Sequence, residues 1–318
     1  MPQISYAQNA EDIVLLRVFG DRPTGFYLDI GASHPTESIT TRFYNQGWSG
    51  INVEPHPLYH AELETVRPRD RNLAVAISDR KGSATFFINA TALLGGLSTL
   101  DADQAGRLNA SGIATEPRTV AVKTLAEICD EYVEDREMDF LKIDVEGHEG
   151  KVISSGDWAR FRPRVVIVEA TEPMRPTPTH QEWEPLLLKN GYHFTLFDGL
   201  NRFYVRDEDA AWIPLLSVPA NVFDDYINCY LHWERTQLTA SVEHLTLAHE
   251  TTLATYHRDT GRLEYEKSQL SAHLSNLRER YDRPGLRTVA HCAGRWARSA
   301  GRRVIHTARA AVLPLIGG

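Results

Sequence analysis

Short apolar segments alternate with segments of helical spacing over residues 1 to 232 of this chain. The apolar segments that we interpret as core strands are GFYLDIG, SGINVEP, NLAVAIS, MDFLKIDVEG and RVVIVEA. Buried strands that alternate with helices form a parallel sheet covered on both faces. SATFFIN, after the turn residues DRKG, is predicted as a hairpin strand, and YHFTLFDGLNRFYV as a closing hairpin. The sequence therefore predicts an α/β domain with a mostly parallel sheet and antiparallel edge strands.

The sequence changes character at Arg235. From there to Asp282 it has no proline and a single glycine, and apolar residues recur at spacings of three, four or seven. This pattern predicts a long helix over residues 235–282. Two arrangements fit the impure heptad repeat. The helix either joins copies of the chain into a homo-oligomer as a coiled coil, or packs back on the α/β domain as one amphipathic helix.

Residues 283–318 form a third segment, which begins with the helix-ending sequence RPGLR. From Leu286 to the last residue there are six arginines and no acidic residue, with apolar residues between them. An arginine-rich amphipathic tail can lie on an anionic lipid surface. We expect either peripheral membrane contact through residues 286–318 or a flexible basic tail without a dedicated partner.

Composition narrows the class of protein. The formal net charge is −8, which argues against nucleic acid as a partner. The three cysteines lie far apart and form no C-x-x-C pair, which favours a reducing compartment over a disulfide framework. The N-terminal segment lacks the pattern of a signal peptide, and no window reaches the roughly 18 apolar residues of a membrane span. We expect a cytoplasmic protein, with the basic tail as its route to the inner face of the membrane.

The segment FYLDIGASHP places an acid, Asp29, inside a buried strand and a small-residue turn, Gly31 and Ala32, at its end. Open parallel sheets bind ligands outside the carboxyl ends of their strands. Glu54 ends the next strand, where a carboxylate can accept hydrogen bonds from both hydroxyls of a ribose. NAD and S-adenosylmethionine both contain ribose, but the turn lacks the G-x-G-x-x-G pattern of pyrophosphate sites, which favours S-adenosylmethionine. The alternative role of Glu54 is to cap the following helix.

The segment FLKIDVEGHEG concentrates acids and a histidine at the end of another predicted strand. Asp144 and Glu169 end neighbouring strands, so we expect them to face one pocket and to hold Mg²⁺ or another hard divalent cation. His148 is the alternative reactive group, as a general base. The competing interpretations are a helix N-cap for Asp144 and a solvated acidic turn for Glu146 and Glu149.

Six segments together resemble the FkbM family of S-adenosylmethionine-dependent methyltransferases. They are YAQNAEDIVLLRVF, GFYLDIGASHP, FYNQGWSGINVEPHP, NLAVAISDRKGSATFF, LKIDVEGHE and VVIVEA, in the order of the family. The resemblance implies a class I methyltransferase (Rossmann-like) fold, S-adenosylmethionine as the cofactor, and O-methylation of a hydroxyl, often on a sugar. Many relatives serve surface-glycan assembly, so the implied acceptor is a carbohydrate or glycolipid. The resemblance leaves residues 235–318 unexplained.

The resemblance also implies roles for individual residues. Those implied to contact the donor are Asp29, Gly31, Ala32, Glu54, Asp79, Gln8 and Glu11. The first three are expected at its methionine end, Glu54 at its ribose and Asp79 near its adenine. Gln8 and Glu11 belong to an N-terminal motif that closes over the donor. Asp144 and His148 are expected beside the transferred methyl group, as the catalytic residues.

Two other functions compete with methylation. A degenerate methyltransferase domain on a helical stalk would act as a non-catalytic scaffold, which the intact acids at the strand ends argue against. An NAD-dependent sugar-modifying enzyme would use the same ribose-binding acid, but the missing glycines disfavour it.

Overall fold

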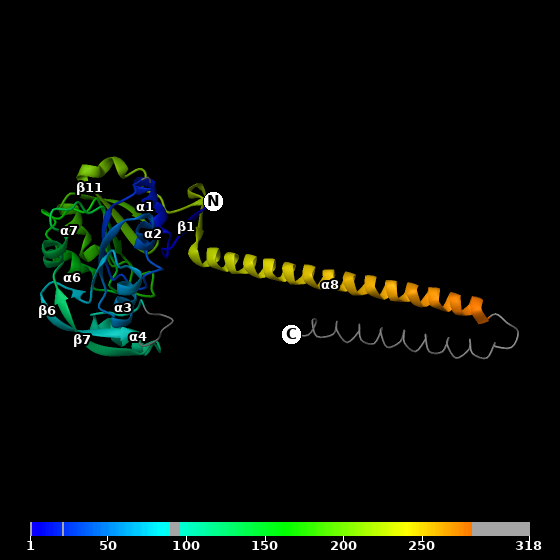
Figure 1. Cartoon of the computed structure of the whole chain (residues 1–318). Helices are drawn as coiled ribbons and strands as arrows, with labels where there is room; N and C mark the ends of the chain where they lie inside the picture. The colour runs from blue at the N-terminus through cyan, green and yellow to red at the C-terminus, as the bar shows by residue number, and fades with distance from the viewer. Residues whose placement is uncertain (1, 21, 90–95, 282–318) are drawn as a thin grey trace. The chain divides into compact units, whose positions relative to one another are not determined.

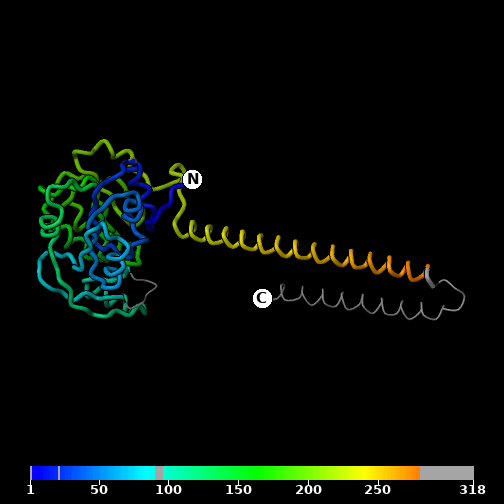
Figure 2. The backbone as a smooth tube through the Cα atoms, viewed as in Figure 1, coloured from blue at the N-terminus to red at the C-terminus, as the bar shows by residue number. Residues whose placement is uncertain are grey.

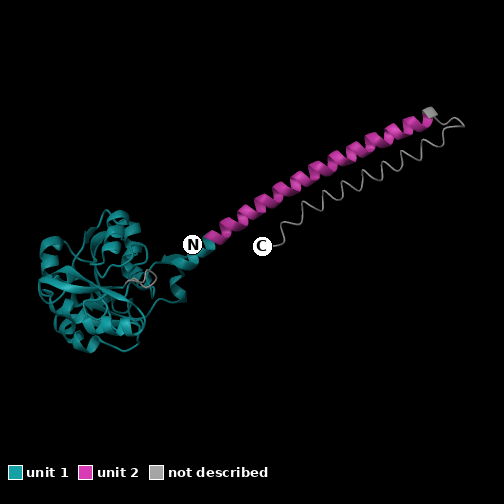
Figure 3. Cartoon of the chain, turned by 90° about the horizontal axis from the view of Figure 1, so that it is seen from below, with its two compact units in different colours: residues 1–236 teal, residues 237–318 magenta. Residues whose placement is uncertain are grey.

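The computed structural model describes residues 2–20, 22–89 and 96–281 (Figure 1). The chain divides into two compact units, Met1–Thr236 and Gln237–Gly318, which Figure 3 colours separately. The first unit is a mixed α/β domain, and the described part of the second unit is helical. The predicted basic tail, residues 283–318, lies outside the described residues.

The main sheet described for the first unit has seven strands. In sheet order they are β10 (Tyr192–Phe197), β11 (Asn201–Arg206), β9 (Val165–Glu169), β8 (Phe140–Ile143), β2 (Phe26–Ile30), β3 (Ser49–Val53) and β4 (Arg71–Leu73). The strands from β9 to β4 pair in parallel, whereas β11 is antiparallel to both β10 and β9. The predicted closing hairpin is therefore confirmed, and it makes the sheet mixed rather than parallel throughout.

Helices and two smaller sheets surround these strands. The α-helices are α1 (Glu11–Phe19), α2 (Ile39–Gln46), α3 (Pro57–Val66), α4 (Ala102–Ala110), α5 (Leu125–Ile128), α6 (Glu149–Ser154), α7 (Glu184–Lys189) and α8 (Cys229–Tyr281). A π-helical turn, Cys129–Val133, continues α5, and the 3₁₀ turns are His180–Glu182, Asp207–Trp212 and Val222–Asp224. One small sheet has the order β5 (Ala76–Ile77), β7 (Thr115–Lys123), β6 (Gly82–Asn89), and the other pairs β1 (Gln3–Ser5) with β12 (Tyr226–Asn228).

Two expectations about the middle of the first unit are wrong. The segment NLAVAIS is predicted to form the third core strand, but its residues are divided between β4, which pairs with β3, and β5, which pairs with β7. The two short strands therefore belong to different sheets. SATFFIN does form a strand, β6, but its partner is β7 rather than the strand before the DRKG turn. The antiparallel partner comes from residues that carry no long apolar run.

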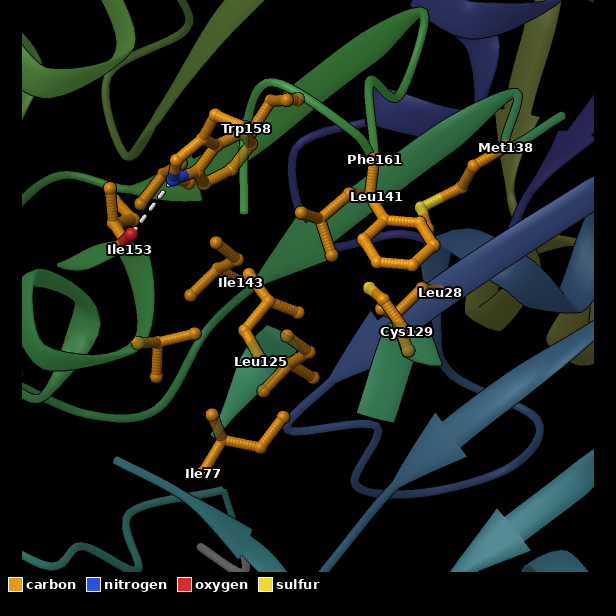
Figure 4. Close-up of a cluster of buried hydrophobic side chains, with 14 of the residues drawn as sticks. Leu28, Ile77, Leu125, Cys129, Met138, Leu141, Ile143, Ile153, Trp158 and Phe161 are labelled. Atoms are coloured by element: carbon orange, nitrogen blue, oxygen red, sulfur yellow. Dashed lines mark hydrogen bonds between the residues drawn. The ribbon is translucent and has the colours of Figure 1, made fainter. Parts of the chain in front are cut away.

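Alternate residues of the central strands face two separate hydrophobic cores. Leu28 of β2 lies in one core, against side chains from α5, α6 and α7. Figure 4 shows part of this core, in which the indole N–H of Trp158 donates a hydrogen bond to the carbonyl oxygen of Ile153 at 2.8 Å. The neighbouring residue Tyr27 lies in the other core, with side chains from α1 and α2. Since helices cover both faces, polar side chains gather at the carboxyl edge of the sheet.

Helix α8 confirms the predicted long helix, although it begins at Cys229 rather than at Arg235. Figure 2 traces it as one unbroken coil. Its apolar side chains are exposed, among them Leu238 at 66% and Leu245 at 67%. Self-association through residues 235–282 stays a prediction. Among the helices of the described residues, none combines the length and the apolar character that a bilayer-crossing segment needs.

Candidate active site

A cavity of about 200 Å³ opens at the carboxyl edge of the main sheet, where β2, β3 and β8 end. Parallel strands present their carboxyl ends at one edge, so residues far apart in sequence meet there. Ile77 of β5 and Phe86 of β6 contribute apolar side chains to the wall of the cavity. The expected site residues that line the cavity are Gln8, Glu11, Gly31, Ala32, Glu54, Asp144 and His148. Asp29, Asp79 and Glu169 lie outside this lining.

A glycine is required at position 31 because the ends of two strands approach each other closely there. Its φ of +81° lies in the left-handed region that favours glycine. A Cβ atom at this position would lie 1.7 Å from the carbonyl oxygen of Asp144, just after β8. The sequence predicts that a ligand approaches this backbone, but the crowding neighbour in the structure is Asp144. The glycine therefore brings together the ends of the two strands that carry acidic residues.

Glu54 follows β3, lines the cavity and is buried. Its Oε2 accepts a hydrogen bond from the backbone N–H of Ser33, and its Oε1 accepts one from the N–H of His56, both at 2.7 Å. Burial raises the pKa of this carboxyl to about 7. Because His56 is the N-cap residue of α3, Glu54 does support the start of that helix. Each carboxylate oxygen still has a lone pair for a ligand hydroxyl.

The acid inside β2 has a partner that the sequence did not reveal. Asp29 lies opposite Lys142 in the β2–β8 register, with Lys142 Nζ 3.6 Å from Asp29 Oδ1 and 3.3 Å from Asp144 Oδ2. Asp29 Oδ2 accepts hydrogen bonds from the hydroxyls of Ser38 and Thr40, at the start of α2. Burial favours a lower pKa for Lys142, but the two carboxylates raise it above its usual value, so the ammonium stays charged. A contact of Asp29 with the donor stays a prediction.

The turn after β8 is held by contacts within and around it. Glu146 has a φ of +56°, and its carbonyl oxygen accepts a hydrogen bond from the hydroxyl of Thr99 at 2.9 Å. The Oε1 of Glu149 accepts hydrogen bonds from the N–H groups of Val145 and Gly147, both at 3.1 Å. Glu149 is buried, so the interpretation as a solvated acid is wrong for this residue. Glu149 shapes the turn, whereas Glu146 lines the cavity.

Glu149→Ala should destabilise the fold by about 2 kcal/mol, because two backbone N–H groups lose their acceptor. Glu149→Gln keeps a carbonyl oxygen for both hydrogen bonds and should stay within about 1 kcal/mol of the natural chain at pH 5. Urea denaturation measures both free energies of unfolding. An equal loss of stability in the two variants would show that the hydrogen bonds to Glu149 Oε1 do not stabilise the turn.

The difference in the free energy of unfolding between the natural chain and Glu149→Gln should depend on pH. Burial raises the pKa of Glu149 from 4.5 to about 7, so the folded state binds the proton more tightly than the unfolded state. The natural chain should therefore lose stability relative to Glu149→Gln as the pH rises from about 4.5 through 7. A pH-independent difference between the two free energies of unfolding would contradict this.

Three carboxylates converge beside the cavity: those of Asp144, Glu146 and Glu169. One oxygen of each lies within 4.8 Å of the others. Glu169 ends β9, is 7% exposed, and its Oε2 has no hydrogen-bond partner. Burial, together with the charges of Asp144 and Glu146, raises the pKa of Glu169 well above its usual range. The two acids predicted as metal ligands thus lie together, and Glu146 joins them as a third that was not predicted as a ligand.

His148 lines the cavity and is the N-cap residue of α6, so Asp144 does not hold that position. Its Nε2 lies 2.9 Å from the hydroxyl oxygen of Ser78. Burial lowers the pKa of the imidazole below its ordinary value of 6.5. The ring is therefore neutral at pH 7, and a neutral imidazole can accept a proton.

The N-terminal motif reaches the cavity together with the last hairpin of the sheet. Gln8, Glu11 and Asn201 all line it, and Glu11 Oε1 accepts a hydrogen bond from the side-chain amide of Asn201 at 2.6 Å. Burial raises the pKa of Glu11 to about 7. Asn201 was not predicted as a site residue. Asp79 accepts a hydrogen bond from the ammonium of Lys151 at 3.0 Å, and its place near an adenine stays a prediction.

These features define an α/β protein with a ligand site over the carboxyl ends of its parallel strands. A comparison with family models agrees: the model described as "Methyltransferase FkbM domain" matches residues 29–194, more than half of the chain. The chain belongs to the FkbM methyltransferase family, as its motifs predict. The match includes Glu54, Asp144, His148 and Glu169 but ends before Asn201. No curated protein matches the chain.

Proposed function

We propose that this chain is an S-adenosylmethionine-dependent O-methyltransferase that acts on a hydroxyl of a sugar in a surface glycan or glycolipid. One observation carries the proposal: the Glu54 carboxylate stands at the cavity wall, fixed by two backbone N–H groups, with lone pairs left for the hydroxyls of a ribose. The family supports methyl transfer. The parallel strands from β9 to β4 support a Rossmann-like class I arrangement.

The residues of the cavity fit this donor chemically. Glu54 suits the ribose, and the apolar side chains of Ile77 and Phe86 suit the adenine ring. The ammonium of Lys142, which also lines the cavity, suits the carboxylate at the methionine end of the donor. When bound, S-adenosylmethionine supplies a methyl group that its sulfonium already activates. Since the chemistry needs little activation of the donor, the task of the protein is alignment and handling of the acceptor proton.

His148 is the residue that accepts the proton of the acceptor hydroxyl. A sugar hydroxyl is a poor nucleophile until its proton leaves, and a general base must lie within reach of that proton. His148 lines the same cavity as Glu54, and burial keeps its imidazole neutral at pH 7 by lowering its pKa. Its contact with the Ser78 hydroxyl holds the ring in place.

His148→Ala should lower the rate of methyl transfer by about 100-fold, the usual contribution of a general base. The rate of the natural chain should hold through neutral pH and fall only below the ordinary histidine pKa of 6.5, since burial lowers the pKa of His148. The variant should lack this decline at low pH. Initial rates with labelled donor between pH 5 and 8 measure both effects.

His56→Asn is the matched control for this variant. The pKa of His56 is also lowered by burial, and its ring caps α3 by accepting a hydrogen bond from the N–H of Leu58, but it does not line the cavity. Asparagine is also a good N-cap residue. The control should keep the natural rate and pH profile. A natural rate in His148→Ala would remove His148 as the base.

The function itself is tested in two steps. Calorimetry with S-adenosylmethionine should give saturable binding at one site, and absence of binding would contradict the proposal. The chain and labelled donor are then incubated with separate glycan, glycolipid and carbohydrate-free fractions of the native cell, and mass analysis identifies the molecule that gains a methyl group. Donor binding with transfer to a non-carbohydrate fraction alone would contradict the proposed acceptor class.

A further inference from the structure

The fold holds the side chains of Asp144, Glu146 and Glu169 close together. Asp144 follows β8, Glu146 lies in the turn fixed by Thr99 and Glu149, and Glu169 ends the neighbouring strand β9. One oxygen of each carboxylate lies within 4.8 Å of the other two. A cation with oxygen ligands at about 2.1 to 2.6 Å contacts oxygens up to about 4 to 5 Å apart. The spacing therefore suits a single ion.

This cluster differs from an exposed acidic patch because one of its carboxylates, that of Glu169, is buried. It is only 7% exposed, and its Oε2 is buried without a hydrogen-bond partner. The Oε2 of Glu146 is buried without a partner as well. A carboxylate oxygen buried without a donor costs several kcal/mol of free energy unless a cation or donor joins it. Both side chains reach into the cluster, so the missing partner belongs between them.

Lys142 does not meet this requirement. Its ammonium lies near Asp29, Asp144 and the carbonyl oxygen of Gly31. Within residues 2–20, 22–89 and 96–281, Glu146 and Glu169 form no ion pair. Asp144 has two oxygens, so its carboxylate can pair with Lys142 and still offer an oxygen to a cation. Lys142 therefore pairs with one carboxylate of the cluster, and Glu146 and Glu169 each keep a buried oxygen without a partner.

We infer that Asp144, Glu146 and Glu169 bind one divalent cation, Mg²⁺ or Mn²⁺, at the ends of β8 and β9. Carboxylate oxygens are the ligands that these hard cations take, with water or a substrate oxygen at the remaining positions. Asp144 and Glu146 line the cavity that also contains His148, so the ion opens onto the proposed reaction site. Resting on the proposed function, its role is to bind the acceptor hydroxyl and lower the pKa of that hydroxyl, while His148 takes the proton.

The test uses the full chain, freed of metal by a chelator, and titrates it with Mn²⁺ in the absence of donor. Calorimetry and the electron paramagnetic resonance signal of free Mn²⁺ should both give one site per chain, and Mg²⁺ should compete for it. Glu169→Gln and Asp144→Asn should each weaken Mn²⁺ binding at least about tenfold. Absence of saturable Mn²⁺ binding to the natural chain would overturn the inference.

Asp12→Asn is the control for loss of a buried carboxylate elsewhere. Asp12 is fully buried, accepts hydrogen bonds from the Ser5 hydroxyl and the Tyr6 N–H, and does not belong to the cluster. This variant should bind Mn²⁺ as the natural chain does. Thermal unfolding of every variant confirms that it is folded, and a folded Glu169→Gln variant with natural Mn²⁺ affinity would overturn the assignment of the ligands.

Donor calorimetry separates this inference from the proposed function. Mn²⁺ binding without S-adenosylmethionine binding would leave the metal site standing and remove the methyltransferase proposal. S-adenosylmethionine binding without Mn²⁺ binding would remove the metal site and leave the methyltransferase proposal standing.

Discussion

Gly31→Ala is expected to destabilise the first unit by about 4 kcal/mol. Two effects add: a non-glycine residue at a φ of +81° costs about 1–2 kcal/mol, and the new methyl group meets the carbonyl oxygen of Asp144 at 1.7 Å. The clash is with backbone, so a side-chain rotation cannot relieve it. Relief requires that the ends of β2 and β8 move apart, which breaks the hydrogen bond from the Asp144 N–H to the Ile30 carbonyl oxygen. Urea denaturation measures the loss.

Gly112→Ala separates the two effects. Gly112 has a similar φ of +86°, but a Cβ atom there would meet nothing within 4 Å. Only the conformational cost remains, so this variant should lose about 1–2 kcal/mol. Equal losses in the two variants would show that the contact with Asp144 does not constrain Gly31.

Glu54→Gln is expected to weaken the binding of S-adenosylmethionine by about 100- to 1,000-fold. Hydrogen bonds to a charged group contribute about 1.5–3 kcal/mol each, and a neutral one about 1 kcal/mol; the amide loses one acceptor for the ribose hydroxyls, and its remaining carbonyl oxygen accepts only a neutral hydrogen bond. Each factor of ten in affinity corresponds to about 1.4 kcal/mol. The amide also turns a donor toward the N–H of Ser33 or His56, which disturbs the wall of the cavity. Calorimetry measures the dissociation constant.

Asp12→Asn is the matched control for this loss as well. Like Glu54, Asp12 is a buried carboxylate that accepts a backbone hydrogen bond, here from the N–H of Tyr6, and burial raises its pKa, to about 6. It does not line the cavity. The control should lose stability but keep the natural dissociation constant. Glu54→Gln with natural donor affinity would contradict the role of Glu54 at the ribose.

The central strands could be predicted because most of their residues are apolar, on both faces of the sheet. β2, β3, β8 and β9 coincide with the apolar segments of the sequence. β7 was not predicted, because its sequence TEPRTVAVK carries charges and a proline and most of its side chains are exposed. Helix α4 was not predicted either. The small sheet depends on this segment, so the error about β6 follows from the missed β7.

The residues of the candidate site that follow a strand could be predicted. The contacts that depend on how two strands pair could not. Glu54, Asp144 and Glu169 were found because an acid after an apolar run is visible in sequence. The pairing of Asp29 with Lys142 depends on the register between strands that are more than a hundred residues apart. A signal was present: the second residues of the segments LDIG and LKID, Asp29 and Lys142, carry opposite charges.

The cavity is completed late in synthesis, because Glu11 and Asn201, which contact each other in its wall, lie near opposite ends of the sequence of the first unit. The β1–β12 pair likewise joins Gln3–Ser5 to Tyr226–Asn228. A growing chain on the ribosome therefore lacks one wall of the cavity until the last hairpin has emerged. We therefore expect the cavity to bind a ligand only after this hairpin has folded onto the rest of the first unit.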